Sequence, residues 1–119
     1  MNKYEDLKIW QKAMDLVEFV YEVMKDMPED EIYGLTSQIK RCSVSIPSNI
    51  AEGAGRNSNK QFTHFLSIAN GSTTELETQI LLVKRLNLCS DKLNQINQIL
   101  DLCSEIKKMN FGLQKTLNI

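Results

Sequence analysis

Apolar residues recur at alternating spacings of three and four along almost the whole 119-residue chain. This period is typical of amphipathic helices, and strand-like alternation of apolar and polar residues is not found. The only two prolines are Pro28 and Pro47, and turn-forming residues are confined to a few short clusters. The sequence therefore predicts an all-α fold, an antiparallel up-down four-helix bundle in which residues 1–119 form one domain. The predicted helices span about 6–26, 31–55, 58–87 and 90–117, with residue 34 as the alternative start of the second helix.

The first predicted helix has an apolar surface that is too broad for one core. Two stripes run side by side, and together they cover roughly 200° of the helix, whereas one core needs about 100°. We expect the helix to bury one stripe and to offer the other to a partner subunit. The alternative is a helix set unusually deep between its neighbours. One stripe consists of Leu7, Trp10, Met14, Val17, Tyr21 and Met24. The other is the candidate oligomer face, with Ile9, Ala13, Leu16, Val20 and Val23.

The second predicted helix carries a line of polar residues beside its apolar line. At helical spacing these residues fall on one stripe at the edge of the core, which we call the polar seam. Glu52 and Arg56 are four residues apart with the acid first, the favourable order for an ion pair. If the seam were buried in an oligomer, its charges would need partners and would fix the register between subunits. The seam consists of Gln38, Arg41, Ser45, Asn49, Glu52 and Arg56.

Pro47 lies inside the second predicted helix. A proline there removes one backbone hydrogen bond and clashes with the preceding turn, so we expect a kink that leaves the carbonyl of Ser43 without its usual donor. Ser43, Ser45 or a water could help to satisfy the freed groups. The alternative is a break into two helices near Ser45.

The third predicted helix begins after Ser58, which forms a capping box with Gln61. If the hairpin between the second and third helices pivots near Arg56, residues whose numbers add up to about 112 lie side by side. Arg41 would then lie opposite Gly71, with Glu75 one turn away. A glycine inside a helix costs about 1 kcal/mol, which a close approach or a crossing side chain would explain. We therefore expect Arg41 to cross Gly71 and to reach Glu75.

The charges and cysteines limit the classes of function. Fourteen basic and fifteen acidic residues give a net charge of -1, so no overall positive field attracts nucleic acid or anionic lipid. Basic doublets could bind RNA only if an oligomer aligned them. Three cysteines without CxxC spacing are expected to be reduced core thiols. The mixed N-terminal segment and the lack of a long apolar run predict a cytoplasmic protein with no membrane partner.

No pattern in the chain predicts catalysis. His64 is the only histidine, and no nucleophile is placed beside it by a motif, so we expect no enzymatic activity and no cofactor. A bundle-core metal site needs Glu-x-x-His pairs, and the sequence has none, so we expect no metal. The segment GAGRNSNK lacks the full phosphate-binding loop motif. The start of the third helix could still hold an anion beside Arg56 and Lys60.

Three long segments resemble the 23S rRNA intervening-sequence protein family, whose members are small bacterial four-helix-bundle proteins. They are YEDLKIWQKAMDL at 4–16, YGLTSQIKRCSVSIPSNIAEGAGR at 33–56 and FTHFLSIANGSTTELETQI at 62–80. The resemblance is strong over roughly the first 90 residues, while the fourth helix matches only in pattern. It implies a ring-shaped homo-oligomer, a pentamer, with no established enzymatic activity.

The same resemblance marks signature positions on the second and third helices. The fold is also similar to that of accessory proteins of diversity-generating retroelements, which associate with nucleic acid and reverse transcriptase through a basic surface. We therefore expect a non-enzymatic oligomeric protein, with a nucleic-acid-associated accessory protein as the alternative that the acidic composition opposes. The signature positions are Arg41, Ser45, Asn49, Glu52, Gly53, Arg56, Gly71, Ser72, Glu75 and Glu77.

Overall fold

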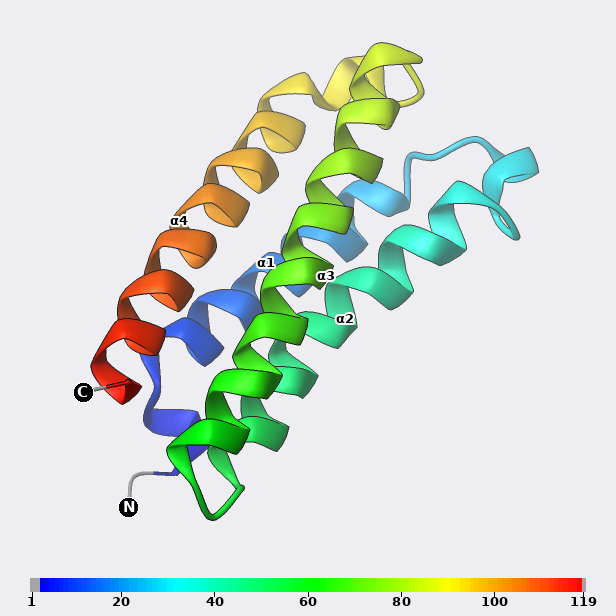
Figure 1. Cartoon of the computed structure of the whole chain (residues 1–119). Coiled ribbons are helices and arrows are strands. Elements are labelled where there is room, and N and C mark those ends of the chain that lie inside the picture. The colour runs from blue at the N-terminus through cyan, green and yellow to red at the C-terminus, as the bar shows by residue number, and fades with distance from the viewer. Residues whose placement is uncertain (1–2, 119) are drawn as a thin grey trace.

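Four α-helices account for most of the fold, which Figure 1 shows from blue at the N-terminus to red at the C-terminus. The structure is a computed structural model that describes residues 3–118, and these residues include no strand. The prediction of an all-α fold with four helices is therefore confirmed. The described chain is compact, with a radius of gyration of 14.8 Å. The helices are α1 (Lys8–Met24), α2 (Leu35–Ala54), α3 (Asn59–Arg85) and α4 (Leu93–Leu117). Three 3₁₀ turns accompany them, at Tyr4–Asp6, Glu29–Glu31 and Ser90–Lys92.

Each helix packs against two others. α2 lies along α3, α3 along α4, and α1 contacts both α2 and α4. Consecutive helices run in opposite directions in Figure 1. α1 and α4 also run in opposite directions, because Lys12 near the start of α1 pairs with Glu105 in the middle of α4, and Asp26 just after α1 pairs with Lys92 just before α4. The core lies between all four helices and contains Leu16, Ile46, Leu76 and Ile99, which are fully buried. No described helix is both long and apolar enough to cross a membrane.

The apolar stripe of α1 that we predicted to face a partner subunit lies in the core of the subunit instead. The predicted oligomer face is the core face, and its residues are at most 3% exposed: Ile9, Ala13, Leu16, Val20 and Val23. In the other stripe Met14 is 39% and Tyr21 41% exposed, while Trp10 and Val17 are half-buried. The spacing of apolar residues does not show which of two parallel stripes is buried. Residue type does favour one of them, because branched aliphatic residues and alanine are buried completely more often than tyrosine or tryptophan.

α2 starts later than the predicted residue 31 and continues through Pro47. The acidic 3₁₀ turn Glu29–Glu31 comes first, and the Glu31 carboxylate then accepts a hydrogen bond from the Leu35 amide at 3.3 Å. The helix is unbroken from Leu35 to Ala54, so the two-helix alternative is wrong. Its two halves run in different directions in Figure 1, as expected for a proline bend. The Ser43 hydroxyl donates to the Lys40 carbonyl at 2.8 Å near this bend.

Candidate functional site

The middle of the polar seam of α2 lies against α3, where two of its members form a hydrogen-bonded group with one residue of α3. The Ser45 and Ser72 hydroxyls are 2.5 Å apart, and the Asn49 amide donates to the Ser45 carbonyl at 2.8 Å. These positions recur at helical spacing and therefore share the side of α2 that faces α3. The structure thus brings together Ser45, Asn49 and Ser72, which the sequence had placed on different helices.

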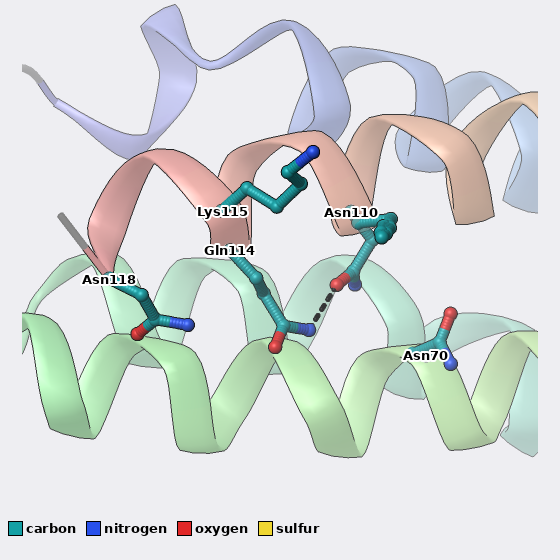
Figure 2. A pocket seen from close by; sticks show the side chains of 6 residues that line it. Asn70, Asn110, Gln114, Lys115 and Asn118 are labelled. Atoms are coloured by element: carbon teal, nitrogen blue, oxygen red, sulfur yellow. Dashed lines mark hydrogen bonds between the residues drawn. The ribbon is translucent and has the colours of Figure 1, made fainter.

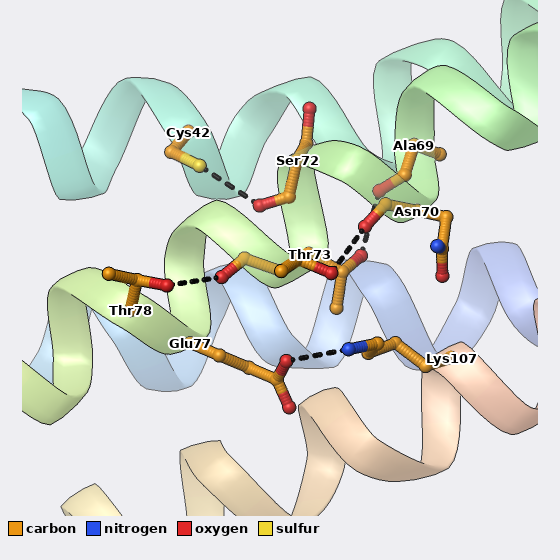
Figure 3. Close-up of polar contacts among 9 residues, drawn as sticks. Cys42, Ala69, Asn70, Ser72, Thr73, Glu77, Thr78 and Lys107 are labelled. Carbon is orange, nitrogen blue, oxygen red and sulfur yellow. Dashed lines mark hydrogen bonds and ion pairs between the residues drawn. The ribbon is translucent and has the colours of Figure 1, made fainter.

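Cys42 joins the seam, although its position in an apolar line predicted a core residue only. Its thiol lies 3.1 Å from the Ser72 carbonyl and 3.1 Å from the Glu75 carboxylate, and these two acceptors share its single proton. Figure 3 shows how Cys42 reaches from α2 to Ser72 on α3. The thiol therefore links the buried core to the polar edge of the α2–α3 contact.

The predicted ion pair between Arg41 and Glu75 does not form in the described chain. Glu75 instead accepts the hydrogen bond from Cys42, while Arg41 is exposed to solvent. The two charged residues line the same hollow of about 210 Å³, which we call the α2–α3 hollow. Arg41 keeps its hydration at the rim, and hydration competes well with an exposed ion pair.

The close approach predicted at Gly71 occurs at Gly53. Ser45 meets Ser72 and Gly53 meets Phe65, so the numbers of facing residues add up to about 117 and the hairpin pivots near Ser58 rather than Arg56. No neighbouring atom in the described part of the chain lies within 4 Å of the place that a Cβ of Gly71 would occupy. A Cβ on Gly53 would lie 2.7 Å from the Phe65 Cβ and 3.2 Å from the Phe62 carbonyl oxygen. Gly53 is therefore the position where α2 and α3 pack too closely for any side chain on α2.

The remaining charged signature residues have separate roles. Arg56 lies 3.6 Å from the Glu52 carboxylate and 4.8 Å from the centre of the Phe65 ring, in an exposed setting. Glu77 does not belong to the seam, because it faces α4 and pairs with Lys107 at 2.9 Å (Figure 3). The signature positions therefore serve two helix contacts rather than one continuous surface.

A group of amide side chains between α3 and α4 was not predicted. Asn110 is 1% exposed, donates to the Leu66 carbonyl at 2.9 Å and accepts from the Gln114 amide at 2.6 Å (Figure 2). A hollow of about 370 Å³ opens beside these two residues. The sequence feature that could have predicted this group is the position of Asn110, a polar residue on the apolar line that runs through Cys103 and Ile106. The other residues lining this hollow are Asn70, Phe111, Lys115 and Asn118.

The start of α3 follows the predicted capping. The Ser58 hydroxyl accepts a hydrogen bond from the backbone N–H of Gln61 at 3.2 Å, as the first half of a capping box requires. A hollow near this end includes Arg56, which already pairs with Glu52.

His64 is exposed and packs edge-on against the Phe65 ring. Within residues 3–118, no three histidine, cysteine or acidic side chains converge as metal ligands would.

All three cysteines are free and buried, and each thiol is held in its protonated form. Burial, followed by the hydrogen bond to Glu75, raises the pKa of Cys42 to about 12. Burial, followed by the charge of Glu77, raises the pKa of Cys103 to about 12. Burial and the nearby Asp26 also raise the pKa of Cys89. The thiolate is the reactive form, so these groups are poor nucleophiles in the folded protein.

We expect iodoacetamide at pH 8.5 to modify the three thiols far more slowly in the folded protein than in denaturant. Mass spectrometry of the intact chain would count the added groups. Above pH 9.0 the unfolded thiols lose protons while Cys42 and Cys103 keep theirs up to about pH 12. Their contribution to stability is therefore complete below pH 9.0 and is lost as the pH rises toward 12. Equal alkylation rates in the two states would contradict this assignment.

The model of a protein family described as 23S rRNA-intervening sequence protein matches residues 5–112. This span contains α1, α2, α3 and most of α4, together with the whole polar seam. No curated protein matches the chain.

Proposed function

Because the chain belongs to the 23S rRNA-intervening sequence protein family, we propose that it is a non-enzymatic protein that assembles with copies of itself. One observation carries this proposal: α1 buries a complete apolar stripe and still presents a second one. This is the stripe of Leu7, Trp10, Met14, Val17, Tyr21 and Met24. Met14 and Tyr21 are exposed, Leu7, Trp10 and Val17 are half-buried, and Met24 is buried. Aligned exposed apolar side chains on a small protein commonly mark a protein contact.

The second stripe continues onto α2 to form what we call the α1–α2 surface. The Lys40 ammonium lies 5.1 Å from the centre of the Tyr21 ring, so these positions are neighbours across the two helices. Val44 follows Lys40 by one turn and is 41% exposed. Tyr4 packs edge-on against Trp10, with ring centres 5.3 Å apart. The surface thus has an apolar centre with cationic and hydroxyl groups at its edge, as protein interfaces do.

We propose that the assembly is a closed ring of five up-down four-helix bundles. The opposite directions of neighbouring helices support the up-down arrangement. A ring of more than two subunits needs two different surfaces that fit each other. Leucines near the C-terminal end of α3 offer the second surface, and their side chains are between 42% and 60% exposed. They are Leu81, Leu82, Leu86 and the neighbouring Leu93 of α4.

The contacts of the polar residues support a structural role rather than catalysis. Ser45, Asn49 and Ser72 bond to one another or to backbone, and Glu77 is held by Lys107. Two basic doublets are also engaged locally, because Lys84 donates to Asn97 at 3.0 Å and Lys107 pairs with Glu77. We therefore do not adopt nucleic-acid binding as the function. The three free thiols favour a reducing compartment, and we propose the cytoplasm.

Sedimentation velocity of three variants tests the self-association surfaces. Met14→Glu places a charge in the centre of the α1–α2 surface, and Leu86→Glu does so at the leucine surface. We expect both variants to sediment more slowly than the unmodified chain and to approach the 13.6 kDa subunit. Asn94→Glu adds the same charge to an exposed position outside both surfaces, and it should assemble normally.

Circular dichroism should show that all three variants keep their helix content. Assembly of Met14→Glu to the same extent as Asn94→Glu would show that the α1–α2 surface is not an interface.

A further inference from the structure

A hollow of about 510 Å³ lies beside the connection between α1 and α2, and we call it the turn hollow. Its apolar lining comes from Met24, Met27, Ile32 and Tyr33. The turn hollow adjoins the α1–α2 surface, because Lys40 lines the hollow and also lies over an aromatic ring of that surface. The proposed self-association surface therefore continues into a recess at one end of the bundle.

Two large apolar side chains at the turn hollow are left uncovered by the subunit itself. Tyr33 is 98% exposed, and the preceding Ile32 is 49% exposed. Hydrogen bonds to water satisfy exposed polar groups, but apolar surface gains stability only when it leaves water. Tyrosine is also enriched among the residues that anchor protein interfaces. The turn hollow thus has the apolar character of a contact with another protein.

The charge left free at the turn hollow is negative. Its two lysines already have partners in the same subunit, because Lys25 pairs with Glu22 at 3.1 Å and Lys40 lies over the Tyr21 ring. Glu29 also lines the hollow, is exposed and forms no ion pair within residues 3–118. A complementary partner therefore combines apolar side chains with a cation.

The C-terminal end of α3 has this combination. Leu82, Arg85 and Leu86 are three or four residues apart, so they share one face of the helix. All three are exposed, and Arg85 forms no ion pair in the described part of the chain. Two uncovered leucines thus accompany a free guanidinium on the second of the two proposed self-association surfaces.

Both regions lie at the same end of the bundle. Figure 1 shows the connection between α1 and α2 and the C-terminal end of α3 at that end, apart from each other. A contact between two regions at the same end keeps neighbouring subunits level, so a series of such contacts can close into a ring. A contact between opposite ends would shift each subunit along the bundle and would build an open filament.

Building on the self-association proposed above, we propose that the turn hollow of one subunit receives the C-terminal end of α3 of the next subunit. Leu82 and Leu86 of the incoming copy pack against the apolar lining of the hollow and are covered by Tyr33. Arg85 of the same copy pairs with Glu29. Every subunit then uses the turn hollow on one side and the end of α3 on the other, as a closed ring requires.

Sedimentation velocity of charge-reversed variants tests this contact. Glu29→Lys and Arg85→Glu each place two like charges at the contact, and each should weaken assembly at least about tenfold. The double variant Glu29→Lys/Arg85→Glu restores an opposite pair and should assemble more tightly than either single variant. Asp101→Lys makes the same charge change as Glu29→Lys at an exposed position outside both surfaces, and it should assemble normally. A double variant that assembles no better than the single ones would overturn the proposal.

Tyr33→Ala tests the apolar part of the contact. Because Tyr33 is 98% exposed, its removal should leave the helix content by circular dichroism unchanged. We expect assembly at least about tenfold weaker than that of the unmodified chain. Assembly of Tyr33→Ala at the unmodified strength would also overturn the proposal.

The unmodified chain in the same experiment separates this contact from self-association in general. If it assembles and the double variant recovers nothing, the contact is wrong and self-association stands. If it remains a monomer at every concentration, both proposals are refuted.

Discussion

Leu16→Ala should lower the free energy of unfolding by about 2–5 kcal/mol, the largest effect that we expect from a single substitution. Leu16 is fully buried between the helices, so the change removes apolar contacts and leaves a cavity. Met14→Ala, in the other stripe of α1 and 39% exposed, should cost less than about 1 kcal/mol in the isolated subunit. Urea unfolding followed by circular dichroism measures both values.

This pair of variants distinguishes the two stripes directly. If Leu16→Ala does not fold, the milder Val20→Ala takes its place, since Val20 is also fully buried. A larger loss of subunit stability from Met14→Ala than from Leu16→Ala or Val20→Ala would show that the wrong stripe has been placed in the core.

Gly53→Ala and Gly71→Ala should change stability in opposite directions. A Cβ at position 53 meets the Phe65 Cβ at 2.7 Å and the Phe62 backbone, so α2 and α3 must move apart, at a cost of about 1–3 kcal/mol. A Cβ at position 71 meets open space, so Gly71→Ala gains up to about 1 kcal/mol from better helix propensity. Thermal unfolding of the two variants beside the unmodified protein measures the difference.

The two glycine variants carry the same chemical change, so each is the control of the other. Stabilisation by Gly53→Ala, or destabilisation by Gly71→Ala, would contradict the α2–α3 geometry.

Local sequence rules predicted the helices better than their contacts. The spacing of apolar residues predicted four helices, and Ser58 with Gln61 marked the start of α3. These features depend on residues within one or two turns of each other. The sequence left the start of α2 open between residues 31 and 34, and the helix begins at Leu35, after the acidic 3₁₀ turn Glu29–Glu31.

A contact between helices was predicted correctly only where the residue pattern of a single helix was enough to show which side faces its neighbour. The seam of α2 faces α3 as an amphipathic stripe must, and Ser45 and Asn49 lie where that stripe places them. The close approach lies at the buried Gly53, whereas Gly71 lies on an exposed side of α3, and counting along the hairpin does not distinguish these two positions. The two stripes of α1 have the same period, so their spacing could not decide which one is buried, although the branched aliphatic residues and alanine of one stripe favoured it for the core. Asn110 was missed because one polar residue does not interrupt an apolar line of helical spacing.

The central claim is that the protein assembles with itself into a closed ring. Sedimentation equilibrium of the unmodified chain, from micromolar to near-millimolar concentration, tests it most directly. The account predicts one species with a mass five times the 13.6 kDa of the subunit, which persists on dilution. A mass of 13.6 kDa at every concentration would contradict it.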